Sequence, residues 1–279
     1  MLRRSTSQLK TEDQLRTMRA SGLIVSRILD ELARRCKPGT TPRELDALAQ
    51  ELLARAGATS SFLGYGGQSG LPPFPAVTCI SVNDQVVHGI PDDRPFVAGD
   101  LVSIDFGAEY QGWHGDSART VAVGEVGAAA AALSTDTRRA LWDGIAAVRA
   151  GRRIGDVSAA IESALRIRRK GYGIVREFTG HGIGTQMHME PDVPNYGRAG
   201  KGPRIVQGMC LAIEPIITLG SPATSTLDDE WTVVTRDHSL AAHWEHTVAV
   251  TPRGLWVLTA EDGGEAELTA RGVSFGPLG

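Results

Sequence analysis

Cysteine is scarce in this sequence, and its few occurrences form no pattern. Only Cys36, Cys79 and Cys210 occur among 279 residues, and they lie far apart. An odd and scattered set does not support a disulfide framework, and it cannot build a cysteine-rich zinc module. We therefore expect a protein of a reducing, cytoplasmic compartment.

Long apolar runs and an excess of charge are also missing. No run of about 18 apolar residues is present, which excludes a membrane-spanning helix. The start, "MLRRSTSQLK", is not followed by the apolar segment of a secretory signal. A net charge of −3 gives no indication of a nucleic-acid or anionic membrane partner. With 42% hydrophobic and 22% charged residues, the composition is that of a globular protein, and we expect a monomer.

The sequence does contain a repeated order of predicted elements, in which two helices followed by strands occur twice. Thr11-Glu-Asp-Gln14 is a capping box that predicts a first helix, and Thr41-Pro-Arg-Glu44 predicts a second. Apolar residues at helical spacing predict two more helices, over 141–148 and 157–165. Short apolar runs predict strands at 77–81, 101–106, 120–123, 209–217, 231–235 and 247–250.

The two copies also share residues. "HGI" occurs at 88–90 and 181–183, "GDLVSID" at 99–105 resembles "GMCLAIE" at 208–214, and "TVAV" occurs at 120–123 and 247–250. Three matches in the same order indicate an internal repeat. We predict a single catalytic domain over 13–262, made of pseudo-twofold halves at 13–130 and 131–262. Residues 1–12 and 263–279 are predicted to be terminal tails.

Four carboxylates lie in or beside the apolar runs, two in each half: Asp105, Asp116, Glu214 and Glu245. We expect each half to place one at a strand end and one just before the next strand. Clustered carboxylates repel one another, and Arg119 is the nearest obvious counter-ion. Two divalent cations would neutralise them. Oxygen ligands with a single imidazole suit Mn, Fe, Co or Zn.

The segment "TGHGIGTQMHMEP" holds three further potential ligands, His181, His188 and Glu190. We expect Glu190 to lie outside the ligand set. Among the remaining histidines, alternation along a strand would put His114 on the face of Asp116 and His246 on the face opposite Glu245. We expect His238 and His243 to be solvated loop residues.

Five of these motifs together resemble the ligand pattern of the methionine aminopeptidases: "SIDFG", "WHGDSART", "TGHGIG", "AIEPII" and "HWEHTVAV". The resemblance runs from about residue 14 to 258. It implies the α/β (α+β) pita-bread fold, with two helix–helix–strand halves around a curved, mostly antiparallel sheet. The 33 residues from His181 to Glu214 are too few for the helical insertion of type II enzymes, so the resemblance is to type I.

The resemblance implies a role for each ligand. Asp116 and Glu245 resemble the bridging carboxylates of two divalent metal ions. Asp105 resembles the residue that completes one metal site, and His181 and Glu214 those that complete the other. Either Glu214 or Glu245 could take a proton from the attacking water, and the resemblance favours Glu214.

The resemblance also implies substrate contacts. His188 resembles the donor to the scissile carbonyl oxygen, and His88 the histidine that contacts the peptide nitrogen beyond the first residue. An apolar pocket for a methionine side chain is expected from Tyr65, Cys79, Met187 and Trp231. The implied substrates are polypeptide N-termini, as on nascent chains at the ribosome, with a small second residue.

Three alternatives stay open. The segment over residues 68–75 makes this region longer than the corresponding region of the family. It contains Pro72-Pro-Phe-Pro75, which could bind an SH3-like partner or form a rigid loop beside the pocket. Prolidases and aminopeptidase P share the fold but carry a separate N-terminal domain. A binding protein on this fold would have lost metal ligands, whereas all five are present here.

Overall fold

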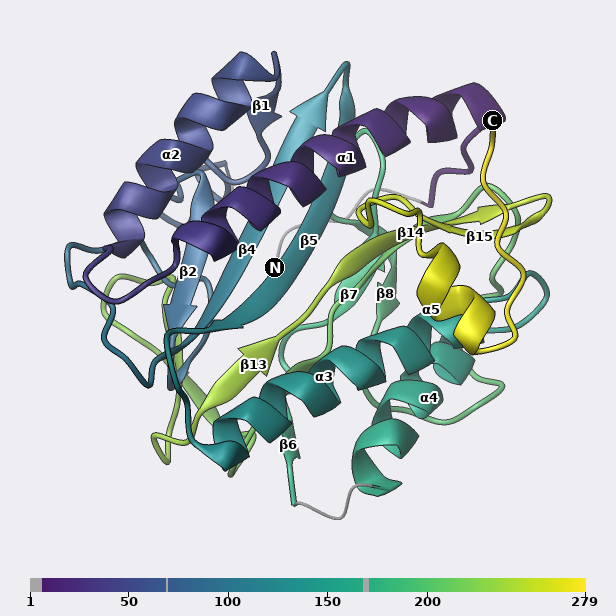
Figure 1. Cartoon of the computed structure of the whole chain (residues 1–279). Coiled ribbons are helices and arrows are strands. Elements are labelled where there is room, and N and C mark those ends of the chain that lie inside the picture. Colours follow the sequence, from purple (N-terminus) through teal and green to yellow (C-terminus); the bar gives the residue numbers. More distant parts are fainter. Residues whose placement is uncertain (1–6, 69, 168–170) are drawn as a thin grey trace.

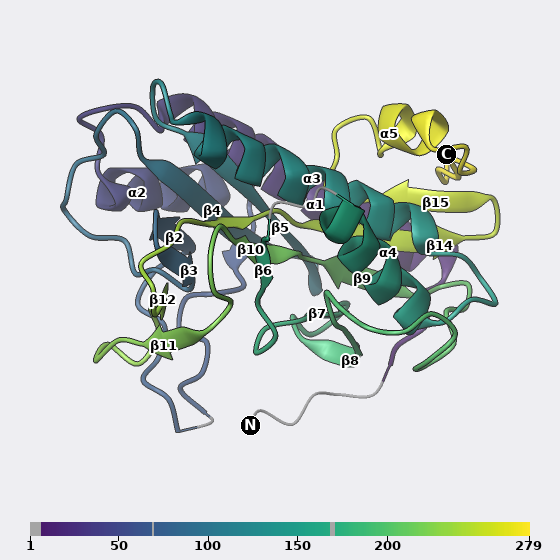
Figure 2. The ribbon, with the colours of Figure 1, turned by 90° about the horizontal axis from the view of Figure 1, so that it is seen from below.

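The computed structural model describes residues 7–68, 70–167 and 171–279, and four long helices lie on one side of its strands (Figures 1 and 2). Short strands and loops lie on the opposite side, where Figure 2 shows β7, β8, β11 and β12. Within the described ranges, no helix has the length and apolarity that a membrane crossing needs. The helices are α1 (Glu12–Arg35), α2 (Pro42–Arg55), α3 (Ala128–Ala147), α4 (Ile154–Ile167) and a short α5 (Glu265–Ala270).

Both predicted capping boxes are present. The Thr11 side chain accepts a hydrogen bond from the backbone of Gln14, whose side chain returns one to the Thr11 backbone. Thr41 and Glu44 repeat this arrangement at α2, where Pro42 occupies the first turn. Each pair satisfies backbone N–H groups that the first helical turn leaves without a partner. Local sequence chemistry therefore determines where these two helices begin.

All strand pairs in the described residues are antiparallel and form four sheets. The first half contributes the hairpin β4–β5, flanked by β2 and β1 on β4. The second half contributes the order β15-β14-β9-β7-β8. The bounds are β1 (Thr59–Ser60), β2 (Thr78–Val82), β3 (Gln85–Val87), β4 (Leu101–Tyr110), β5 (Trp113–Ala122), β6 (Gly173–Ile174), β7 (Gly180–Gly182), β8 (Met189–Val193), β9 (Cys210–Ile213), β10 (Ile216–Thr218), β11 (Thr224–Thr226), β12 (Val233–Thr235), β13 (Ala241–His243), β14 (His246–Thr251) and β15 (Gly254–Val257).

Each half has a hydrophobic core of its own. In the first half, α1 and α2 bury side chains such as Leu29 and Leu45 against Ile104 and Phe106 of β4. In the second half, α3 and α4 bury Leu141 and others against β9, β10, β14 and β15. Burial of one such side chain stabilises the fold by about 1.5–3 kcal/mol. Two cores of like construction confirm the predicted pair of helix–helix–strand halves.

Hydrogen bonds between β5 and the start of β14 join the halves. The Thr247 hydroxyl donates to the carbonyl oxygen of Asp116 (2.8 Å) and accepts from its backbone nitrogen (3.2 Å). The next residue of β5 adds a second contact, because the Ser117 hydroxyl donates to the carbonyl oxygen of Glu245 (2.6 Å). These bonds hold together two strand segments that lie about 130 residues apart in sequence.

The terminal segments pack onto the domain as well. The backbone nitrogen of Lys10 donates to Gly208 (2.8 Å), and residues 1–6 of the predicted N-terminal tail lie outside the described residues. In the predicted C-terminal tail, α5 buries Leu268 completely, and Leu278 is also buried. The last segment therefore contributes to the second-half core and to the cluster beneath α1.

Helix α1 packs closely against the backbone of Leu258, and Gly22 is the point of contact. A methyl group there would lie 2.2 Å from the carbonyl oxygen of Leu258, and the backbone of Gly115 packs on the same glycine.

Gly22→Ala should destabilise the protein by about 1–3 kcal/mol through overpacking, although helix propensity alone would stabilise it by about 1 kcal/mol. Urea unfolding measures the sign. Gly127→Ala, whose methyl group would meet no atom within 4 Å, is the control and should change stability by less than about 1 kcal/mol.

Candidate active site

Asp105 and Asp116 lie on one face of the β4–β5 hairpin. Asp116 is paired with Gly107, and Asp105 lies two residues before Gly107 on β4. Because side chains alternate along a strand, the two carboxylates are diagonal neighbours. The prediction of one carboxylate at a strand end and one before the next strand is wrong for this half. Both strands continue to the hairpin turn after Tyr110, so both carboxylates lie within strands.

The second half repeats this diagonal with a histidine. His181 on β7 is paired with Ala212 on β9, and Glu214 follows β9 two residues after Ala212. His181 and Glu214 therefore share a face, and Nε2 of the ring lies 3.6 Å from Oε1 of the carboxylate. Nε2 also lies 3.8 Å from Oδ2 of Asp116, across the junction of the halves.

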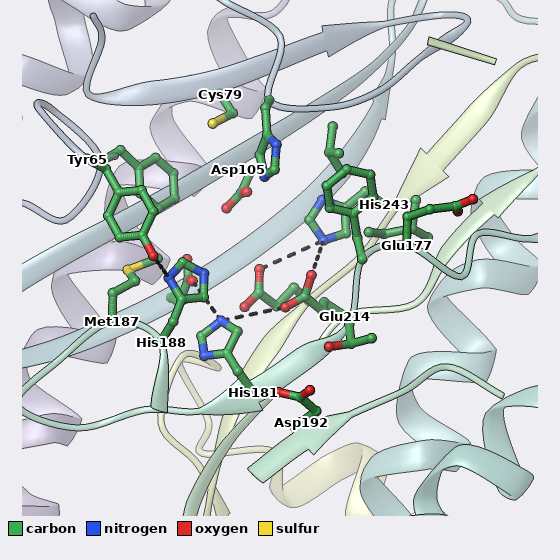
Figure 3. Close-up of a pocket in the computed structure, with 18 of the residues that line it drawn as sticks. Tyr65, Cys79, Asp105, Glu177, His181, Met187, His188, Asp192, Glu214 and His243 are labelled. Atoms are coloured by element: carbon green, nitrogen blue, oxygen red, sulfur yellow. Dashed lines mark hydrogen bonds and ion pairs between the residues drawn. The ribbon is translucent and has the colours of Figure 1, made fainter. Parts of the chain in front are cut away.

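Glu245 reaches this cluster directly before β14. Its backbone nitrogen donates to Ala118, the residue paired with Asp105 in the neighbouring strand. Single ligand atoms of Asp116, His181 and Glu245 lie within 4.8 Å of one another, and all three residues are buried. Figure 3 shows Asp105, His181 and Glu214 directed toward the same space. The fold thus brings together all five predicted metal ligands.

Burial and mutual repulsion disfavour the charged forms of these carboxylates. Desolvation raises the pKa of Asp105 to about 7. The pKa of Asp116 lies well above its ordinary value, chiefly because of desolvation and then because of the charges of Asp105 and Glu214. Desolvation, followed by the charge of Asp116, likewise raises the pKa of Glu245. Without added positive charge, this site would hold protons at neutral pH.

Basic side chains do not supply that charge. Neither lysine nor arginine occurs among the described residues that line the cavity. Arg119, the counter-ion named from the sequence, forms an ion pair with Asp30 instead. Among the described residues, seven acidic ones line the cavity: Asp105, Asp116, Glu177, Glu190, Asp192, Glu214 and Glu245. Its charge suits cations, including the amino group of a peptide N-terminus.

Divalent metal ions fit the donors that are present. Oδ1 of Asp105, Oδ1 of Asp116 and Oε1 of Glu245 are buried and have no hydrogen-bond partner in the described part of the chain. Unpaired buried carboxylate oxygens are costly, and coordination to a cation removes that cost. Carboxylates with one imidazole suit the borderline divalent ions named above.

Two further predicted histidines border the cluster. The ring of His188 lies 4.2 Å from that of His181, centroid to centroid, and its Nδ1 is hydrogen-bonded to the Tyr65 hydroxyl (2.6 Å) (Figure 3). His88 packs edge-on against Phe178 and Trp231. It has a φ of 56°, which is strained for a residue with a side chain and is typical of functional positions. Desolvation lowers its pKa to about 4.

The apolar residues predicted to bind substrate form one cluster beside the carboxylates. Cys79 is paired with Asp105 across β2 and β4, and Met187 and Trp231 pack near it. Gly107 lets Phe62 and Met187 pack closely against β4, because a methyl group there would lie 2.9 Å from Phe62 and 3.1 Å from Met187. All eleven predicted site residues line one cavity of about 1020 Å³: Tyr65, Cys79, His88, Asp105, Asp116, His181, Met187, His188, Glu214, Trp231 and Glu245.

Phe62 and Phe74 also belong to this apolar cluster, and neither was predicted from the sequence. Phe74 belongs to the predicted loop over residues 68–75, of which residue 69 lies outside the described residues. Its ring is 2% exposed and packs edge-on against Trp231 (5.3 Å). The Trp231 indole nitrogen donates to the carbonyl oxygen of Pro72 (2.9 Å). These contacts favour the rigid loop beside the pocket over a partner-binding motif.

The remaining histidines lie in different surroundings. His243 was expected in a solvated loop, and that is wrong. It ends β13, is 2% exposed and lines the cavity with Glu214 and Glu245. His114 hydrogen-bonds Ser61 (2.8 Å). The ring of His246 hydrogen-bonds Thr259 (2.9 Å), and that of His238 pairs with Asp84 at the surface. Glu190 is exposed at the cavity.

Comparison with known proteins agrees with this geometry. The sequence profile of metallopeptidase family M24 matches residues 16–252. The chain is 48% identical over 255 residues to methionine aminopeptidase 1 of Mycobacterium tuberculosis, covering 90% of this chain and 94% of that protein.

Solved structures show the same relationship. The crystal structure of methionine aminopeptidase from Thermotoga maritima matches with a TM-score of 0.87 and 37% identity, covering 92% of this chain and all of that one. The prolidase from Pyrococcus furiosus matches with a TM-score of 0.69 and 22% identity, over 90% of this chain and 65% of that one. The prolidase likeness shows the shared fold alone.

The raised carboxyl pKa values predict how metal-free protein responds to pH. A carboxyl group whose pKa is higher in the folded than in the unfolded state stabilises the fold fully below about pH 4. That contribution is lost as the pH rises through the folded-state value, about 7 for Asp105. In chelator, the melting temperature should therefore fall by about 3–8 °C between pH 6.5 and pH 8, a range above the unfolded-state pKa of histidine, in which buried neutral histidines such as His88 contribute little. Added Mn²⁺ at pH 7.5 should restore it. A melting temperature that does not depend on pH would contradict the burial of unpaired carboxylates.

Proposed function

We propose, because the chain belongs to the metallopeptidase family M24, that it is an aminopeptidase that removes the N-terminal methionine from polypeptides. The observation that carries this proposal is the adjacency of two features in one cavity. The cluster that fits divalent cations adjoins the apolar pocket of Tyr65, Cys79, Met187 and Trp231. A substrate whose first side chain fills that pocket would have its first peptide bond at the carboxylates.

The pocket has the chemistry for methionine. It presents aromatic rings and a second thioether, which suit a flexible, polarisable side chain. The buried Phe74 and Trp231 close one wall, and Phe62 with Met187 close another. We propose that the pocket admits one unbranched side chain and that the second substrate residue must be small. The natural substrates would be the N-termini of newly made chains at the ribosome in the cytoplasm, with the protein acting as a monomer.

We propose that the five ligands hold two divalent ions. Asp105, Asp116 and Glu245 would hold one, and Asp116, His181, Glu214 and Glu245 the other. Such a pair supplies a water of lowered pKa and polarises the scissile carbonyl group. Support comes from the diagonal pairs of the two halves and from the unpaired buried oxygens of Asp105, Asp116 and Glu245.

The side chains of this chain would move the proton and bind the carbonyl group. Glu214 is less buried than Glu245, so it is better placed to accept a proton and return it to the leaving amine. The Tyr65 hydroxyl holds the His188 ring, which would donate to the carbonyl oxygen as negative charge develops there. The neutral His88 would contact the peptide nitrogen beyond the first residue.

A panel of peptides separates this proposal from the alternatives. Purified protein with Mn²⁺ or Co²⁺ should release methionine from Met-Ala-Ser and should leave Xaa-Pro peptides intact. Cleavage of the Xaa-Pro peptides would favour a prolidase-type activity. No cleavage of either peptide, with cation bound, would favour a binding protein.

Two histidine substitutions test the division of roles. His181→Ala should abolish activity and weaken metal uptake, because it removes a ligand. His188→Ala should keep the metal content but lower kcat by about 10²-fold, on the scale of losing an oxyanion donor. Metal analysis alongside steady-state kinetics makes the comparison. Equal metal loss in both variants would contradict these assignments.

A further inference from the structure

His243 is a buried histidine at the metal-binding cluster that neither the ligand set nor the proposed mechanism uses. It lies at the end of β13, two residues before Glu245. Its Nε2 is buried and, among the residues described, has no hydrogen-bond partner. The ring lies beside Glu214 (Figure 3) and lines the same cavity as Glu214 and Glu245. A buried polar atom at a functional cavity without a partner requires an explanation.

The two oxygens of Glu214 face different imidazoles. Oε1 lies 3.6 Å from Nε2 of His181, and Oε2 lies 4.0 Å from Nε2 of His243. Nε2 of His243 also lies 3.9 Å from Oε2 of Glu245. One carboxylate oxygen of Glu214 is thus directed to the ligand His181, and the other to a ring outside the predicted ligand set.

The backbone of His243 is fixed on both sides. Its nitrogen donates to the hydroxyls of Thr120 (2.9 Å) and Ser103 (3.2 Å), and its carbonyl oxygen accepts from Thr120 (2.8 Å). The two hydroxyls also bond each other (2.9 Å), and β13 pairs His243 with Ile216. These contacts fix the main chain of His243 beside the cluster, so the ring and the carboxylates can approach one another by side-chain rotation alone.

We propose that His243 is a positioning residue that donates its Nε2–H to the carboxylates of Glu214 and Glu245. The gap exceeds a hydrogen bond by about 1 Å, which a rotation of either carboxylate closes. A donor on Oε2 of Glu214 leaves Oε1 for the cation beside His181 and fixes the orientation of the proposed proton acceptor. Such partners of metal ligands orient them and tune metal affinity. This inference rests on the proposed dinuclear function.

Two replacements of the His243 ring test the proposal, one that keeps a hydrogen-bond donor and one that lacks it. His243→Phe keeps a buried ring but removes the donor, whereas His243→Gln keeps an N–H donor. Calorimetric titration gives the dissociation constants of the two Mn²⁺ ions. In His243→Phe, the dissociation constant of the weaker site should rise by about 10–100-fold. On Met-Ala-Ser, kcat should fall by a similar factor while KM changes less than about threefold, since no substrate contact is lost. His243→Gln should restore both quantities to within about threefold of the unsubstituted protein.

Controls separate this role from structural damage. The melting temperature of each variant in chelator reports on folding alone. His238→Phe, at an exposed ring that pairs with Asp84, should leave activity and metal binding unchanged. If the unsubstituted protein binds cations and cleaves the peptide, the proposed function stands whatever the His243 variants do.

Two results would overturn the inference. One is His243→Phe with unchanged cation affinity and kcat. The other is His243→Gln as impaired as His243→Phe, together with a changed visible absorption spectrum of bound Co²⁺. That pair of findings would make the imidazole a direct metal ligand instead of a donor to the carboxylates.

Discussion

Burial of several carboxylates at one point is the constraint on which the rest of this structure depends. Asp116 and Glu245 are 3% and 2% exposed, and Asp105 lies on the same face of the sheet. Desolvation and mutual repulsion both oppose their ionisation, and basic residues are absent from the described lining of the cavity. Such an arrangement is stable only when the carboxyl groups bind protons or cations. Binding of metal ions would remove the repulsion between the carboxylates, so metal binding would stabilise the folded protein.

The fold counters this repulsion with backbone and hydroxyl hydrogen bonds outside the cluster. Thr247 binds the backbone of Asp116 on both sides, Ser117 binds that of Glu245, and Glu245 binds Ala118. The carboxylates are thus held by their main chains and need no favourable contact between their side chains. The same junction joins the two halves, so the site and the interface between the halves depend on one set of contacts.

The halves share a plan but differ where substrate would bind. Each places two ligands diagonally on neighbouring strands, Asp105 with Asp116 and His181 with Glu214. The first half adds the loop that brings Phe74 onto Trp231, and the second adds Met187, His188 and His243. The shared plan accounts for the metal cluster, and the departures from it account for the pocket.

The sequence by itself determined the features that depend on neighbouring residues. The capping boxes at Thr11 and Thr41 define helix starts by hydrogen bonds over three residues, and the repeated motifs around Asp105 and Glu214 indicated two halves. The five carboxylate and histidine motifs predicted a set of metal ligands, and the fold brings these residues into one cavity. Tertiary structure alone decided the surroundings of His243 and Phe74. Their burial depends on partners such as Thr120 and Trp231, more than a hundred residues away, and no local pattern encodes such contacts.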